Sequence, residues 1–208
     1  MHDEPRAPRW PSFIVFAAIG IIYFLVPEQV AVGPSWLLFG VIVLMLIPLH
    51  LAHAGDHHTL ARRLALTLLS MITLMVAGSA SLLLAQLPGQ RTTAPWLLVD
   101  AALIWVANVL TFTLWYWEID GGGPRRRRQN GHAGTDFIFP QMAVQAVSSS
   151  SWSPELVDYL FLAFNTSTAF SPTDTLVLSR RAKLLMMAQS LIALVVVAVL
   201  AARAVNTL

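Results

Sequence analysis

The sequence predicts an all-α fold, an integral membrane helical bundle of about five transmembrane helices plus one re-entrant or interfacial half-helix. Hydrophobic residues make up 56% of the 208 residues and charged residues only 12%, about half the charged share of a soluble domain. Five apolar stretches reach or approach the length that crosses about 30 Å of hydrocarbon. A sixth, shorter amphipathic stretch ends in a run of hydroxyl-bearing residues, which sets it apart from the other five.

Turn residues and aromatic residues bound the five spans. The first opens with a proline at a helix start and closes before Pro27, and the third ends at Pro88. The fourth ends in three consecutive aromatic residues, where an aromatic belt would lie at the lipid headgroups. The predicted spans are Pro11–Val26, Trp36–His53, Leu64–Leu87, Trp96–Trp117 and Leu184–Ala204.

The spans divide the chain into three parts. Residues 1–117 are a four-span membrane bundle, residues 118–154 a polar linker rich in Gly, Arg and Ser, and residues 155–208 a pore-like half-helix, a loop and the final span. The linker is shorter than forty residues and lacks core periodicity, so we expect no soluble domain in it. The chain has no cysteine, which excludes disulfides and thiolate chemistry.

The distribution of basic residues predicts the orientation. If residues 155–178 dip into the membrane and return, eleven of the thirteen basic residues lie on the side of the N-terminus, and only Arg91 and Arg203 lie on the other. The positive-inside rule then places the N-terminus in the cytoplasm and the C-terminus outside. A complete crossing by residues 155–178 would weaken this bias. We therefore expect a multi-pass protein of a bacterial inner (plasma) membrane with a re-entrant segment.

The loop after the half-helix is the first candidate site. Non-helical backbone at membrane depth is tolerated only where it is buried in protein or lines a water-filled cavity. Two readings stay open: a connector at the membrane face whose hydroxyls bond back to the helix, or a polar vestibule for an ion or small solute. Asp174 or Ser179 is expected to cap the following helix. The candidate residues are Thr166, Thr168, Ala169, Phe170, Ser171, Pro172, Thr173 and Asp174.

A histidine cluster is the second candidate. His50, His53 and His57 follow at i, i+3 and i+7, so one helical face could hold all three. Imidazoles at this spacing bind divalent metals such as zinc, with a distant acid completing the shell. Glu118 should end the fourth span on the same side and is the candidate acid. The alternatives are an interfacial polar cap or a pH sensor.

Other polar residues lie beside or inside the spans. The run Arg125, Arg126, Arg127 and Arg128 is either a topology device or a site for anionic lipid headgroups. It lacks the aromatic interleaving of a nucleic-acid site, so no nucleic-acid partner is expected. Asp100 and Asn108 lie within the fourth span, where a polar group either bonds a neighbouring helix or marks a functional site.

Two resemblances rest on particular motifs. The run from Tyr159 to Asn206 resembles the pore half of the potassium-channel superfamily, with Phe164-x-Thr166-x-Thr168 ending a pore helix and a final helix closing the chain. Most of the chain also resembles a family of uncharacterised bacterial polytopic membrane proteins, through the blocks Trp115–Pro124, Asp136–Gln141 and Thr168–Asp174. The filter is degenerate, because Ala169-Phe170-Ser171-Pro172-Thr173 stands where a potassium channel has two glycines. A ladder of carbonyls selective for potassium is therefore not expected.

These observations predict a channel-like or transport-related protein without a potassium-selective filter. The channel resemblance implies a homo-oligomer, since one such half cannot surround a pore. The alternative is a non-transporting accessory protein that binds lipid or partner helices. A membrane metalloenzyme built on the histidines and Glu118 ranks third. The sequence shows no nucleotide loop or catalytic triad, so an enzyme and a cofactor are not expected, apart from a divalent metal at the histidines.

Overall fold

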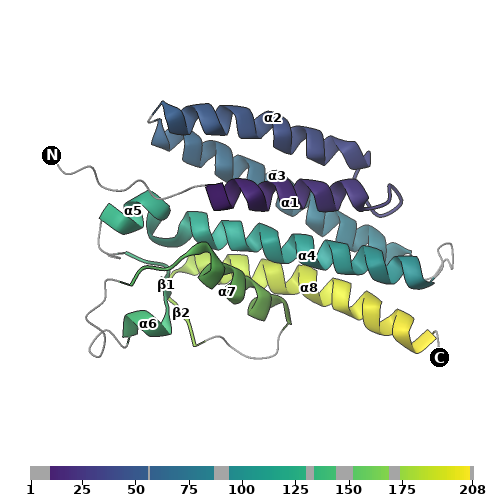
Figure 1. The fold of residues 1–208 in the computed structure, drawn as a ribbon. Coiled ribbons are helices and arrows are strands. Elements are labelled where there is room, and N and C mark those ends of the chain that lie inside the picture. The colour runs from purple at the N-terminus through teal and green to yellow at the C-terminus, as the bar shows by residue number, and fades with distance from the viewer. Residues whose placement is uncertain are drawn as a thin grey trace.

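The computed structural model describes residues 10–55, 57–86, 94–129, 134–143, 152–168 and 174–206. Five long helices coincide with the five predicted apolar stretches and lie alongside one another (Figure 1). Three of them are long and apolar enough to cross a membrane, over Thr59–Ala85, Trp96–Gly122 and Arg180–Ala202. The long helices are α1 (Trp10–Leu25), α2 (Ser35–Ala54), α3 (His58–Ala85), α4 (Ala94–Ile119) and α8 (Arg180–Asn206).

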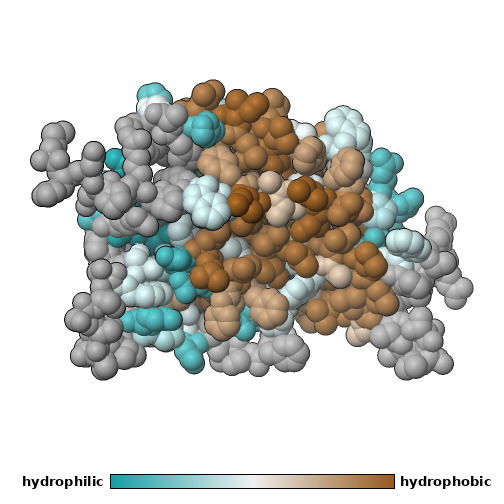
Figure 2. Space-filling model, in the orientation of Figure 1, coloured by the Kyte–Doolittle hydropathy of each residue, from teal (hydrophilic) through white to brown (hydrophobic). Residues whose placement is uncertain are grey.

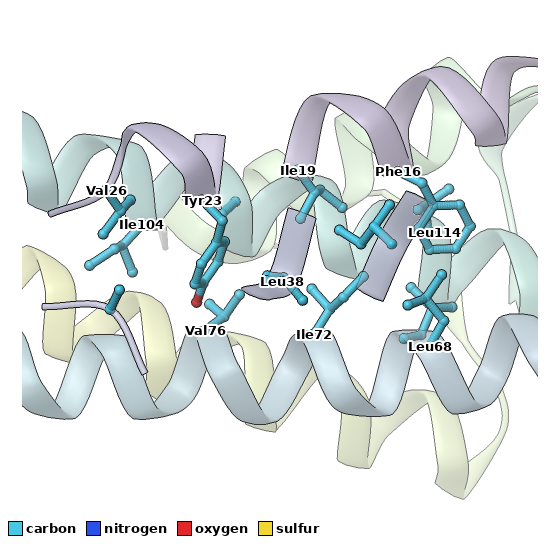
Figure 3. Close-up of a cluster of buried hydrophobic side chains, with 14 of the residues drawn as sticks. Phe16, Ile19, Tyr23, Val26, Leu38, Leu68, Ile72, Val76, Ile104 and Leu114 are labelled. Carbon is cyan, nitrogen blue, oxygen red and sulfur yellow. The ribbon is translucent and has the colours of Figure 1, made fainter. Parts of the chain in front are cut away.

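Apolar side chains from all five of these helices form the main core. Phe16, Ile19 and Tyr23 of α1 lie between side chains of α2, α3 and α4 (Figure 3). Two hydrogen bonds cross this bundle: the Tyr23 hydroxyl donates to Ser79 Oγ at 3.2 Å, and Trp115 Nε1 donates to Thr73 Oγ1 at 2.8 Å. Both polar pairs are thus satisfied inside apolar packing.

The stretch predicted as a linker is built into the fold. It contains the short helices η2 (Asp120–Gly122), α5 (Pro124–Gln129) and α6 (Pro140–Ala143) and the strand β1 (Phe137–Ile138). Three glycines with φ of 57°, 84° and 102° turn the chain sharply after α4, in a region of φ that side chains with a Cβ rarely adopt. Phe137, Phe139 and Tyr159 then join Phe112 and Tyr116 of α4 in a second core.

The fold is all-helical apart from one two-residue strand pair among the residues that the structure describes. Strand β1 pairs antiparallel with β2 (Leu176–Val177), so that Phe137 faces Val177 and Ile138 faces Leu176. A composition-based prediction misses this two-residue ladder because its partners are 40 residues apart. The ladder holds the segment just before α8 against β1.

Helix α7 (Leu156–Thr168) packs against α4 and α8 and is about half as long as α8. The first turn of α7 is joined to Asp120 by the Tyr159 hydroxyl, which donates to the Asp120 carboxylate. The last turn lies beside α8, where Ser190 Oγ donates to the Thr166 carbonyl at 3.3 Å. Ser190 is ten residues into α8, roughly 15 Å along a helix of roughly 40 Å. At Leu178 the chain is again at the end of the bundle where α7 begins, since the Leu178 amide donates to the Asp136 carbonyl at 2.9 Å. The segment therefore enters and leaves at one end of the bundle.

The surface has an apolar middle and hydrophilic ends. On the face shown in Figure 2, a broad band of hydrophobic side chains covers the middle of the bundle, and hydrophilic side chains gather at its two ends. Large apolar side chains are exposed on every long helix, for example Leu74 of α3 and Leu194 of α8.

Candidate functional site at helix α7

Asp120 fixes the base of α7. Its carboxylate is fully buried, directly after α4, and four groups donate hydrogen bonds to it. Oδ1 accepts from Thr135 Oγ1 at 2.6 Å, from the Asp136 amide at 2.6 Å and from the Phe137 amide at 3.3 Å. Oδ2 accepts from the Tyr159 hydroxyl at 2.5 Å. One carboxylate thus ties the end of α4, strand β1 and helix α7 together.

Arg127 supplies the positive charge beside this carboxylate. Its side chain is 2% exposed, and its Nε lies 3.9 Å from Asp120 Oδ2. One guanidinium nitrogen donates to the carbonyls of Trp117 and Asp120, each at 2.7 Å. The guanidinium also lies over the rings of Trp117 and Tyr159, at 4.8 and 5.1 Å from their centroids. Buried charges need such pairing and hydrogen bonding to be tolerated.

Asp136 and Arg181 close the same end of the bundle from the side of α8. Arg181 donates to Asp136 in a bidentate arrangement, with Nε at 2.8 Å from Oδ1 and a terminal nitrogen at 2.6 Å from Oδ2. The amide of Gly121 also donates to Asp136 Oδ2, at 3.2 Å. Burial by itself raises the pKa of Asp136. Hydrogen bonds from Arg181 and Ser179, the Arg181 charge and the Gly121 amide outweigh it and hold this pKa below its usual value.

This pKa predicts how stability depends on pH. The Asp136–Arg181 pair stabilises the fold fully above the pKa of an unfolded aspartate, about 4. Its contribution disappears as the pH falls through the lower pKa of folded Asp136. We expect the difference in unfolding free energy between the wild type and Asp136→Asn to shrink steadily below pH 4. Chemical unfolding in detergent micelles from pH 3 to pH 7 measures it, and a constant difference over that range would contradict the prediction.

Gln189 joins three helices at the middle of α7. It is fully buried in α8, and its Nε2 donates to the Ala163 carbonyl and to Ser167 Oγ, both at 2.7 Å. Its Oε1 accepts from the hydroxyl of Tyr116 in α4. Its backbone carbonyl accepts from Asn108 Nδ2 at 3.3 Å. Both amide hydrogens and the amide oxygen of the Gln189 side chain are thereby engaged, which holds α7 against both neighbouring helices.

Asn108 leaves one acceptor unused. It is fully buried, and its Oδ1 is the single buried side-chain oxygen without a hydrogen-bond partner among the residues that the structure describes. A buried acceptor without a donor costs free energy. This oxygen lies close to the level at which α7 ends, since the Asn108 amide donates to the Gln189 carbonyl.

The tip of α7 carries the first predicted residues. Thr166 Oγ1 donates to the Leu162 carbonyl at 2.8 Å, and Thr168 Oγ1 donates to the carbonyls of Phe164 and Asn165 at 3.2 and 3.1 Å. These bonds agree with the reading in which the hydroxyls bond back to their own helix. Asp174 is exposed on the returning chain, whereas Ser179 caps α8 by accepting from the Ala182 amide at 3.2 Å. The other predicted loop residues, Ala169, Phe170, Ser171, Pro172 and Thr173, lie outside the described residues.

The histidine cluster is only partly brought together. His50 is exposed and packs edge-on against Phe13 at 6.0 Å between ring centroids, and His57 is exposed at the turn between α2 and α3. Glu118 is buried at the end of α4, beneath Gly123 and next to the Arg62 side chain. Within the described part of the chain, no three such side chains are placed to hold a metal ion. The side chain of His53 lies outside that part, so the metal site stays a prediction.

The arginine run splits into two roles. Arg125 and Arg126 are exposed, which leaves both interpretations of the run open for them. Arg127 is instead buried under Trp117 and Tyr159, because the glycine turn folds α5 back over the end of α4. It serves the interior of the protein and not its surface. The side chain of Arg128 lies outside the described residues.

The residues that hold α7 were not among those predicted from sequence. Gln189 could have been identified from the sequence as a residue that bonds a neighbouring helix, since it is an amide within a largely apolar stretch. Asp120 and Asp136 lie in two of the blocks that carry the family resemblance, and the structure brings these blocks together around Tyr159 and Arg181. No model of a known protein family, no curated protein and no solved structure matches this chain.

Proposed function

We propose that the chain is a five-span protein of a bacterial inner membrane, with a cytoplasmic N-terminus, in which α7 and its loop form part of a path for a small cation. The observation that carries the proposal is the course of α7, which stops alongside Ser190 while the chain returns to Asp136. In a bilayer, this course puts the end of α7 at membrane depth. Such backbone is stable where it is packed in protein or lines an aqueous path.

The apolar band supports the membrane placement. Three helices have the length and composition of membrane spans, and the hydrophobic middle of the surface lies between two hydrophilic ends (Figure 2). Helices α1 and α2 are apolar and shorter, and they pack with these three in one core. The end that holds Arg125, Arg126, Arg180 and Lys183 faces the cytoplasm under the positive-inside rule.

The chemistry at the tip of α7 favours a cation. A helix that ends inside the protein presents carbonyl groups and the negative end of its dipole. The threonine hydroxyls and the unused Asn108 Oδ1 add further acceptors at this level. Potassium selectivity is not part of the proposal, because the loop lacks the glycines of a carbonyl filter. One α7–α8 pair cannot surround a path, so the proposal includes a homo-oligomer.

Flux through proteoliposomes tests the proposal. We expect the purified full chain to conduct potassium and sodium with little preference between them, and to exclude chloride. Thr168→Val removes the hydroxyl and keeps the side-chain volume, and we expect it to reduce cation flux at least about tenfold, the effect of about 1.4 kcal/mol on a barrier.

Thr113→Val is the matched control for this test. Thr113 makes the same type of bond, to the Val109 carbonyl at 2.8 Å, but lies in α4. We expect its flux to stay within about twofold of the wild type. No flux above empty liposomes, or equal losses in the two variants, would contradict the cation path.

A second function is favoured by one observation. The hydroxyls of Thr166 and Thr168 are already bonded within α7, and Val157, Phe161 and Phe164 expose an apolar face on the same helix. An accessory protein would use this face to hold partner helices. Absence of flux together with a partner that remains bound during purification would support this alternative.

A further inference from the structure

One face of α8 changes character along its length. Arg180 and Lys183 are exposed at its start, and Leu184, Met187, Leu191 and Leu194 continue the same face. The spacing of three and four residues places these side chains one above another along the helix. The four apolar side chains are between 61% and 66% exposed. The face is therefore a basic head followed by an apolar strip.

The two cations of this face have no anionic partner within the described part of the protein. The ion pairs at this end of the bundle include Arg127 with Asp120 and Arg181 with Asp136, and neither involves Arg180 or Lys183. Arg181 is turned toward Asp136, which leaves Arg180 and Lys183 as the basic groups that point outward at the start of α8. On the neighbouring β2 segment, Leu176 and Leu178 are 60% and 51% exposed. Exposed apolar side chains thus precede the basic pair in the chain, on the β2 segment, and follow it, along α8.

We infer that this face binds a phospholipid with an anionic headgroup. The headgroup phosphate lies against Arg180 and Lys183, and the acyl chains lie along Leu184, Met187 and Leu191. Charge complementarity selects the headgroup. The apolar strip selects a lipid over a soluble anion, because only a lipid covers both parts of the face. The inference rests on the proposal that α8 crosses the membrane, but it does not depend on transport.

The site differs from the predicted site at the arginine run. Arg125 and Arg126 are exposed on the short helix α5. They carry the same charge at the same end of the bundle and therefore provide a matched control. If headgroup binding were only an effect of net charge, both pairs would contribute equally.

The test measures lipid binding to the purified full chain in detergent micelles. Phosphatidylglycerol, phosphatidylcholine of the same acyl chains and inorganic phosphate are titrated separately, with native mass spectrometry and thermal unfolding as readouts. We expect phosphatidylglycerol to bind preferentially and to raise the unfolding temperature, and inorganic phosphate to do neither. The double variant Arg180→Gln with Lys183→Gln should bind phosphatidylglycerol at least about tenfold more weakly. The variant Arg125→Gln with Arg126→Gln should bind it within about twofold of the wild type.

Three outcomes would overturn the inference: no preference for the anionic lipid, equal losses in the two double variants, or the same stabilisation by inorganic phosphate. The substituted side chains are exposed, so the unfolding temperature without added lipid shows whether each variant is folded. Lipid binding without ion flux would refute the proposed transport alone. Flux without lipid preference would refute the lipid site alone.

Discussion

Asp120→Ala is expected to lower the free energy of unfolding by about 3–5 kcal/mol, the cost of removing one partner of a buried ion pair. The substitution removes the acceptor for the Tyr159 hydroxyl and for two backbone amides. It also leaves the Arg127 guanidinium in the interior without a carboxylate. Both losses fall on groups that water cannot reach, so neither is compensated by solvation. Chemical unfolding in mixed micelles at neutral pH measures the change.

Two further variants sharpen this result. Asp120→Asn keeps an oxygen that accepts from the amides but removes the charge. We therefore expect its free energy of unfolding to lie between those of the wild type and Asp120→Ala. Asp174→Ala removes an exposed carboxylate from the returning chain and should change stability by less than about 0.5 kcal/mol. A loss below about 1 kcal/mol in Asp120→Ala would show that the carboxylate is not what joins α4, β1 and α7.

Gln189→Leu is expected to loosen α7 specifically. Leucine has a similar size but cannot donate to the Ala163 carbonyl and Ser167, nor accept from the Tyr116 hydroxyl. Unpaired buried groups of this kind cost about 1–3 kcal/mol. At that level the side chain of α8 that remains bonded to α7 is Ser190, whose hydroxyl donates to the Thr166 carbonyl over a longer distance of 3.3 Å. Hydrogen exchange should therefore accelerate in Leu156–Thr168 more than in α3 or α4.

The matched control for this change is Gln129→Leu. Gln129 is exposed at the end of α5, so the same substitution there should alter stability by less than about 0.5 kcal/mol. A double-mutant cycle of Gln189→Leu with Ser167→Ala should give a coupling of about 0.6 kcal/mol, typical of hydrogen bonds between membrane helices. Uniform acceleration of exchange over all helices would argue against a local role for Gln189.

The sequence predicts the long helices well because length and apolar composition determine them. Their bounds in the structure differ from the predicted spans by a few residues at the ends. Ser179 was also identified as a capping residue, since the cap depends on only a few neighbouring residues.

The polar end of the bundle was harder to predict. The sequence predicts that Gly121 and its neighbours belong to a polar linker, whereas their positive φ values make a defined turn in the structure. The partners of Asp120 lie 15, 16, 17 and 39 residues away, and most of them are backbone amides or an aromatic hydroxyl, which carry no periodic signal. Tyr159 resembles any other aromatic residue of a half-helix. Long-range hydrogen bonds therefore determine the site, and a single sequence shows them only weakly.

The two-residue ladder has a mechanical consequence. Because β2 is paired with β1, the segment just before α8 is held to the polar end of the bundle that follows α4. A displacement of β1 would therefore reach β2 through the backbone pairing and the start of α8 through Asp136 and Arg181. A ligand or a partner that shifts β1 would thus act on the start of α8 through these contacts alone.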